Sequence, residues 1–149
     1  MNKKYELIDE TQEWNGRILH RIRALADFGD VKAGELGGWI EKEENLSHNG
    51  DAWVYGDAQV YGDAWVHGNA EICKTSDYFT SGPIGSRNDT ITFFRCKDGK
   101  IRATTGCFYG DLDQLEAAVR SKHKNNNYAQ AYMGVIAAAK AQMGADQNV

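Results

Sequence analysis

The most regular feature of the chain is a period of six between hydrophobic positions near its middle. Four hexads follow one another without a gap, starting at Gly50, Gly56, Gly62 and Gly68. Each hexad has Ala in its third place and a branched Val or Ile in its fifth. Neither a helix nor a simple hairpin needs this period, but a coil of short parallel strands does. Residues 50–73 are therefore predicted to form a parallel β-helix with Gly-Asp or Gly-Asn at its corners.

The repeat resembles the left-handed β-helix of bacterial hexapeptide-repeat acyltransferases and of γ-class carbonic anhydrases, with Gly one place later than in their commonest pattern. The resemblance covers residues 50–73 and implies a triangular coil of about eighteen residues a turn. Because so short a run makes little more than one turn, we expect an irregular turn from residues 34–47 and subunit association to cover the ends, with a trimer favoured. Trp53 and Trp65 stand at the outward position, which predicts an exposed aromatic contact surface.

Residues 1–33 are expected to form an N-terminal strand cap, followed by the β-helix over residues 34–73. Strands are predicted at residues 5–8 and 17–25, with a turn between them. Alternation in the second strand places Ile18, His20, Ile22 and Ala24 on one face, opposite Arg17, Leu19, Arg21 and Arg23. We interpret the arginines as solvated charges and keep them as secondary candidates for anion binding.

Residues 74–149 are predicted to form an α+β module, so that the whole chain is mainly β with an α+β C-terminus. Its first candidate for chemistry is the loop 81–89, which reads Ser-Gly-Pro-Ile-Gly-Ser-Arg-Asn-Asp. Backbone N–H groups, hydroxyls and a guanidinium suit a phosphate or carboxylate. The predicted ligand-binding residues in this loop are Gly85, Ser86, Arg87 and Asn88. The alternative is a structural turn in which Arg87 pairs with Asp89.

The segment 90–108 is predicted to be a hairpin about the two-residue turn Asp98-Gly99. This turn places Arg95 directly opposite Arg102, and their mutual repulsion, roughly a few tenths of a kcal/mol, favours an anion between them. Phe93 stands beside the arginines, where its ring can stack on a planar group. Thr104 lies on the same face and completes the predicted site. A register slip of one residue is an alternative that would separate the arginines.

Two helices are predicted to close the chain. Asp111, with Gln114 three residues later, signals the start of the first helix, and Asn127 signals the second. Asp111 or Asp113 is also an alternative neutraliser of the arginine pair. The basic segment 120–127 between the helices is interpreted as a solvated loop rather than as the rim of an anionic site.

Taken in order, the strand segment, the short hexapeptide run and the Gly-Pro-Ile-Gly-Ser-Arg loop resemble small phage- and prophage-encoded proteins. This resemblance spans most of the chain and implies a phage setting, in the cytoplasm of a bacterial host. It carries over no activity.

Charge is divided unevenly along the chain. Residues 1–73 hold 7 Lys and Arg against 14 Asp and Glu, a balance of −7, whereas residues 74–149 hold 10 against 7, a balance of +3. The C-terminal half is therefore the better place for an anion. Three cysteines without a CxxC pair suit reduced thiols in a cytosol, and no apolar run predicts a membrane span.

Three classes of function are open. No catalytic residue, metal ligand or cofactor is predicted, because His48 and His67 match neither a zinc set nor a general base with a partner. We predict a non-catalytic oligomer that binds an anionic, nucleotide-like small molecule, in the concrete version a sponge for a cyclic nucleotide immune signal. Long nucleic acid is not expected as a partner, since the chain carries −4 overall. The alternatives are a structural or adaptor protein without a small ligand, and a hexapeptide-type acyltransferase.

Overall fold

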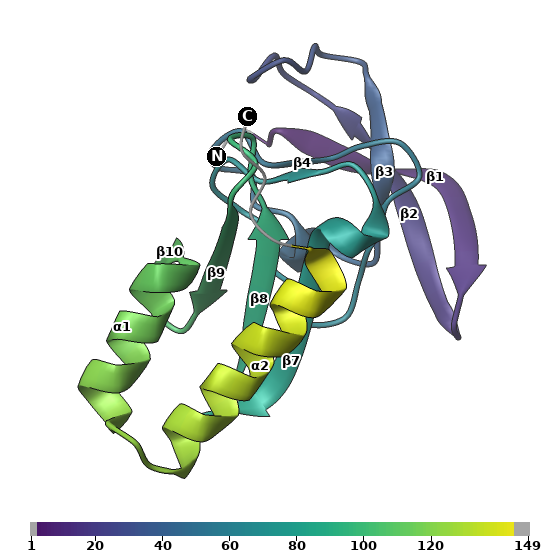
Figure 1. Cartoon of the computed structure of the whole chain (residues 1–149). Coiled ribbons are helices and arrows are strands. Elements are labelled where there is room, and N and C mark those ends of the chain that lie inside the picture. Colours follow the sequence, from purple (N-terminus) through teal and green to yellow (C-terminus); the bar gives the residue numbers. More distant parts are fainter. Residues whose placement is uncertain (1–2, 145–149) are drawn as a thin grey trace. The chain divides into compact units, whose positions relative to one another are not determined.

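The computed structural model describes residues 3–144 of the chain (Figure 1). The chain divides into two compact units, unit 1 at Met1–Asp77 and unit 2 at Tyr78–Val149. The described part of the chain is mainly β, and the two α-helices in it both lie near the C-terminus, as the sequence predicts. Within the described residues, no helix is long and apolar enough to cross a membrane.

Unit 1 begins with a hairpin that continues into the repeat. The strands β1 (Tyr5–Trp14) and β2 (Arg17–Ala24) pair antiparallel. Asn15 and Gly16 between them have φ values of 53° and 76°, as a two-residue hairpin turn of this hand requires. One sheet has the order β1-β2-β3-β5, with β3 at Leu36–Ile40 and β5 at Gln59–Val60. A second sheet pairs β4 (Trp53–Val54) with β6 (Glu71–Ile72). Two 3₁₀ turns, η1 and η2, lie at Glu43–Asn45 and Thr75–Asp77.

Three parallel pairings involve the repeat, one within it and two with the segment that precedes it. Ile40 pairs with Val60, Leu46 with Val66, and Val54 with Ile72. These partners are 20, 20 and 18 residues apart, so the segment before the hexads supplies the first strand of two of the three pairings. The irregular turn expected at residues 34–47 thus takes part in the parallel pairing.

The two predicted interior phases of the hexads are buried. The alanines and the branched residues at these places are at most 2% exposed: Ala52, Val54, Ala58, Val60, Ala64, Val66, Ala70 and Ile72. The four hexad glycines all have positive φ, which agrees with their place at corners. A Cβ atom at Gly50 would lie 2.8 Å from the carbonyl oxygen of Gly68, so this corner also needs glycine for the close approach of the chain.

Asn45 joins neighbouring passages of the chain inside unit 1. Its side chain is fully buried, accepts from the backbone N–H groups of Glu41 and Lys42 at 3.2 and 3.0 Å, and donates to the carbonyls of Gly62 and Ala64 at 3.0 and 2.9 Å. Every polar group of the buried amide therefore has a partner, as stability requires.

The prediction of an exposed row of aromatic side chains on the hexads is wrong. Trp53 is 1% exposed, and its ring packs edge-on against Tyr5 at 6.1 Å and Phe28 at 5.2 Å. The N-terminal segment has folded over Trp53, which leaves Trp65 exposed and stacked on His67 at 3.9 Å. Burial of an indole beneath nearby aromatic rings removes apolar area from water without needing a second subunit.

The predicted alternation of the second strand is also wrong at one end. Ile18 is 51% exposed while Leu19 is buried together with Ile22 and Ala24. The pairing of β2 with β3 shifts register between Arg21 and Arg23, and a bulge of this kind reverses which residues face the core. The three arginines of β2 form ion pairs within unit 1: Arg17 with Glu41, Arg21 with Glu10 and Asp57, and Arg23 with Glu6.

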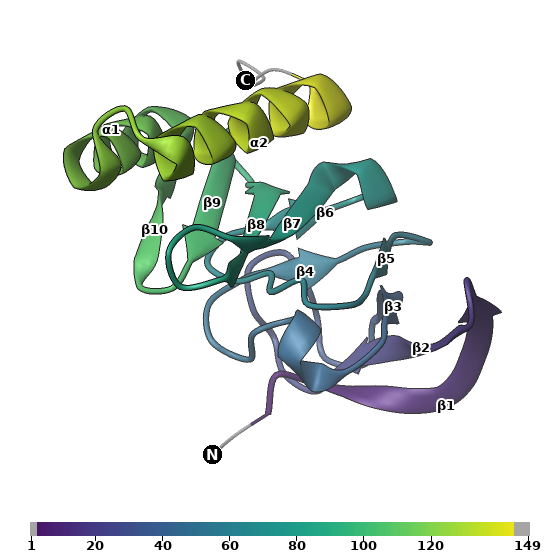
Figure 2. The same ribbon diagram turned by 90° about the horizontal axis from the view of Figure 1, so that it is seen from below.

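Unit 2 is an antiparallel sheet covered by two helices. The strands are β7 (Tyr78–Ile84), β8 (Asp89–Arg95), β9 (Ile101–Thr105) and β10 (Phe108–Asp111), in the order β10-β9-β8-β7. The helices α1 (Leu112–His123) and α2 (Asn127–Met143) lie side by side on one face of this sheet (Figure 2). The core between them contains Ile84, Ile91, Phe93, Ile101 and Ala103 from the sheet and Leu115, Val119, Ile136 and Ala139 from the helices.

The starts of both helices follow from local hydrogen bonding. Asp111 caps α1 and exchanges two bonds of 2.8 Å with Gln114, which confirms the predicted capping box. The cap of α2 is Asn126, whose side chain accepts from the N–H of Ala129 at 3.0 Å. The predicted start at Asn127 is thus one residue late, because each of the three consecutive asparagines at 125–127 has the chemistry of an N-cap.

Candidate functional site

The β8–β9 hairpin closes with a different turn from the one predicted. The N–H of Cys96 donates to the carbonyl of Lys100 at 2.8 Å, and the N–H of Gly99 donates to Cys96 at 2.9 Å. Three residues therefore form the loop, with Gly99 at a φ of 83°, as in a type I turn followed by a glycine bulge. The extra loop residue slips the register by one, so that Arg95 pairs with Ile101 and Phe94 with Arg102.

The opposed arginine pair consequently does not exist. Arg95 is 7% exposed and donates to the carbonyl oxygens of Gly99 at 3.0 Å and Met143 at 2.6 Å. Arg102 makes two bonds of 2.9 Å to the carboxylate of Asp98. This guanidinium lowers the pKa of Asp98 to about 2. Each arginine is neutralised or satisfied within the protein, and neither Asp111 nor Asp113 is needed for this.

The other predicted residues of the hairpin are not brought to an open site. Phe93 is fully buried in the core beneath the helices, and Thr104 is 4% exposed. A ring that already packs in the core has no face left for a ligand. The hairpin part of the predicted site is thus not assembled as expected.

A pocket does form at the Gly-Pro-Ile-Gly-Ser-Arg loop. It has a volume of about 200 Å³ and is bounded by three segments that are distant in sequence. Ser86 and Arg87 come from the β7–β8 loop, Asp89 is the first residue of β8, and Thr105 to Phe108 come from the β9–β10 turn. The last turns of α1 and one residue of α2 complete the lining: Leu115, Ala118, Val119, Lys122, His123 and Tyr132.

The loop is held in place by close packing rather than by an ion pair. Gly85 has a φ of 78°, and a Cβ atom there would overlap the Tyr132 hydroxyl and lie 2.9 Å from its ring carbon Cζ. The carbonyl of Gly85 accepts from the N–H of Asn88 at 3.2 Å, and Asn88 also has positive φ, at 55°. Both residues therefore shape the loop, while Ser86 and Arg87 between them face the pocket.

The charged groups of the pocket have no partners among the described residues. Arg87 and Asp89 do not form the ion pair of the alternative interpretation, and neither they nor Lys122 make any other described ion pair. The Thr105 hydroxyl is buried without a hydrogen-bond partner in the described structure. These groups contrast with the paired arginines elsewhere in the chain.

His123 is the last residue of α1 and lies close to two aromatic rings. It is 9% exposed, with ring centroids 5.3 Å from Tyr128 and 5.9 Å from Tyr132. Together with Lys122 it belongs to the basic segment that the sequence analysis assigned to a solvated loop. The loop assignment is wrong for residues 120–123, which still belong to α1, and of these Lys122 and His123 line the pocket.

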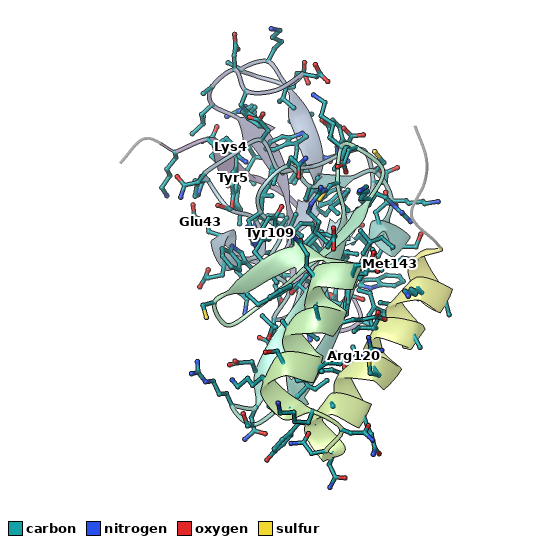
Figure 3. The ribbon with its side chains drawn as sticks, turned by 60° about the vertical axis from the view of Figure 1, so that its left-hand side comes forward. Lys4, Tyr5, Glu43, Tyr109, Arg120 and Met143 are labelled. Atoms are coloured by element: carbon teal, nitrogen blue, oxygen red, sulfur yellow. The ribbon has the colours of Figure 1, made fainter. Side chains whose placement is uncertain are left out.

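The histidines of unit 1 offer less for chemistry. His48 Nδ1 accepts from the N–H of Lys4 at 3.1 Å, and Nε2 lies 3.2 Å from a carboxylate oxygen of Glu43. The ring stacks on Tyr5 at 4.1 Å, and Figure 3 shows Lys4, Tyr5 and Glu43 gathered in this region. Both ring nitrogens are thus engaged in structure. Within residues 3–144, no group of three or more His, Cys, Asp or Glu side chains is arranged to hold a metal.

Comparison with known proteins gives a partial likeness. The chain is 36% identical over 61 residues to the uncharacterized acetyltransferase YdcK of Escherichia coli (strain K12). The match takes in 36% of this chain and 19% of that protein, so the chain spans about a fifth of its relative's length. No family model matches the chain.

Proposed function

We propose that unit 2 is a non-catalytic binding module for a small anionic ligand, held in the pocket between the β7–β8 loop and α1. The observation that carries this proposal is the pair of cations, Arg87 and Lys122, that line one pocket without a described acidic partner. A ligand anion is the group that would satisfy them, with the Ser86 and Thr105 hydroxyls as further hydrogen-bond partners.

The position of Lys122 has a structural explanation that does not involve a ligand. Lys122 lies in the last turn of α1, where any cation is favoured by the helix dipole. Arg120 lies in the same last turn but does not line the pocket. The two residues therefore separate binding from the dipole effect, and Arg120 is a matched control.

The whole chain, in this proposal, is a phage-type homo-oligomer in the host cytoplasm. Its hexads would wind as a left-handed β-helix and join three chains, and unit 2 would sequester a cyclic nucleotide immune signal without turnover. The parallel pairing at intervals of 18 to 20 residues supports the β-helix. The positive balance of the C-terminal half supports the anion.

A thermal-shift screen tests the proposed function. The panel contains cyclic dinucleotides, cyclic ADP-ribose isomers, NAD and coenzyme A, and a ligand at a hundred times its dissociation constant should add about 2.7 kcal/mol of stability. The shift should vanish in Arg87→Ala/Lys122→Ala and persist in Arg120→Ala. Absence of any shift in the wild-type protein would contradict the proposal and favour a structural or adaptor role.

The partial likeness to an acetyltransferase favours an acyltransferase as the second candidate. The candidate general base is His67, the one histidine within a regular hexad. Burial lowers the pKa of His67, which keeps its ring neutral as a general base needs. This candidate predicts that acetyl-coenzyme A is consumed in the presence of an acceptor amine and that His67→Ala abolishes the turnover. The binding proposal predicts that the bound ligand is recovered unaltered.

A further inference from the structure

The pocket contains a carboxylate as well as cations. Asp89, at the start of β8, lines it and is partly buried, whereas Arg87 and Lys122 are exposed at its mouth. A carboxylate oxygen of Asp89 lies 3.3 Å from the position of a Cβ atom on Gly106, so the acid leans on the β9–β10 turn. No hydrogen bond or ion pair of the Asp89 carboxylate is found among the described residues.

The charge of Asp89 acts on a second residue of the pocket lining, Tyr132. Burial, and after it the charge of Asp89, raises the pKa of Tyr132. A carboxylate in this position repels the anionic part of any ligand and attracts a hydrogen-bond donor. A simple anion such as phosphate is therefore a poor match for the pocket as a whole, although it matches the cations at the mouth.

The volume of the pocket limits how large a part of a ligand can be enclosed. At about 200 Å³ it exceeds a cavity of about 150 Å³ that holds benzene, and it is smaller than the roughly 300 Å³ at which drug-sized sites begin. One ring system fits inside, next to the apolar side chains of Phe108, Leu115 and Val119. A larger ligand, including a cyclic dinucleotide, would place one base in this pocket and its remainder outside.

We infer that the pocket recognises a nucleotide through a single base, with Asp89 as a specificity-determining residue that accepts N–H groups from the base edge. The base packs against Phe108 and Val119, and its phosphate lies at the mouth with Arg87 and Lys122. This inference rests on the proposed function, and it adds a requirement that an anion alone does not meet. Carboxylates are suited to such base edges because the exocyclic amino groups and ring N–H groups of bases are donors.

Binding titrations of Asp89→Asn test the inference, with the four ribonucleoside monophosphates and inorganic phosphate as probes. In the wild-type protein, at least one nucleotide should bind tenfold or more tightly than phosphate. Asp89→Asn should weaken that nucleotide about tenfold and strengthen phosphate severalfold, because it removes both an acceptor and a negative charge. Asp113→Asn, which removes an exposed charge that does not line the pocket, should change neither affinity by more than about twofold.

The outcomes separate this inference from the proposed function. If wild-type protein binds phosphate as tightly as every nucleotide, or if Asp89→Asn moves both affinities in the same direction, the role of Asp89 is wrong while the anion site stands. If neither phosphate nor any nucleotide binds and the wider panel gives no thermal shift, both fail. Asp89→Ala repeats the test should Asp89→Asn not fold, since it leaves no polar group at that position.

Discussion

Replacing Arg95 should destabilise the protein strongly and leave ligand binding intact. Arg95 is 7% exposed, and its guanidinium joins the β8–β9 loop at Gly99 to the last residue of α2, Met143. A hydrogen bond to a charged donor contributes about 1.5–3 kcal/mol, and part of the sum is offset because the desolvated charge also disappears. We therefore expect Arg95→Met to lower the free energy of unfolding by about 3 kcal/mol.

Urea denaturation followed by far-ultraviolet circular dichroism measures this loss. Arg102→Met is the control, because its ion pair with Asp98 is at the surface and should contribute no more than about 1 kcal/mol. A loss below about 1 kcal/mol for Arg95→Met would refute the structural role assigned to this residue. Abolished ligand binding in a folded Arg95→Met protein would revive the hairpin as a binding site.

Three further predictions concern packing and pH. Gly85→Ala should destabilise unit 2, because its Cβ would meet Tyr132 and a φ of 78° is strained for a residue with a side chain. In a melting experiment Gly85→Ala should cost less stability in a Tyr132→Ala background than in the wild-type protein, and an equal cost in both would assign the loss to backbone strain alone. Asn45→Ala should lower the free energy of unfolding in urea by about 2–4 kcal/mol, because four buried or partly buried backbone groups each lose a hydrogen bond to the amide. A loss under about 1 kcal/mol would contradict this role of Asn45. Burial lowers the pKa of Lys4 from 10.5 to about 8, so between these pH values the unfolded chain binds more protons and stability should rise with pH by on the order of 3 kcal/mol. Lys4→Met should lose that rise in pH-dependent denaturation, and an equal rise in both proteins would contradict the assignment to Lys4.

The sequence was sufficient where a signal is local and repeated. The hexad phases at Ala52 and Val54, the turn at Asn15-Gly16 and the Asp111 cap each depend on residues that lie within a few positions of one another. Each places a glycine, a small side chain or a capping group where the backbone needs it. Such requirements hold whatever the remainder of the chain does.

The sequence was insufficient where one residue of register decides the outcome. The loop at Gly99 has three residues instead of the predicted two. Arg95 is therefore buried and bonded to Gly99 instead of facing Arg102 in the predicted ligand site. The burial of Trp53 depends on Tyr5 and Phe28, which come from the distant N-terminal segment. The periodicity within the hexads carries no information about which distant side chains pack over Trp53.

The candidate site was half visible in the sequence. The loop with Ser86 and Arg87 has a recognisable composition, and it does line a pocket. The contribution of Lys122 and His123 comes from the packing of α1 against the sheet, which brings two helical turns beside a loop some 35 residues earlier. The signal that could have found them is the capping box at Asp111, which fixes where each later residue of the helix lies.

The central claim is that an anionic ligand occupies this pocket, and Cys107 reports on it directly. This thiol is exposed and lines the pocket, Cys73 is exposed in unit 1, and Cys96 is buried. Peptide-resolved mass spectrometry would measure iodoacetamide labelling rates with and without the nucleotide that gives the largest thermal shift. We expect the nucleotide to slow labelling of Cys107 at least fivefold and to leave the rate at Cys73 unchanged. Unchanged labelling of Cys107 under saturating nucleotide would contradict it.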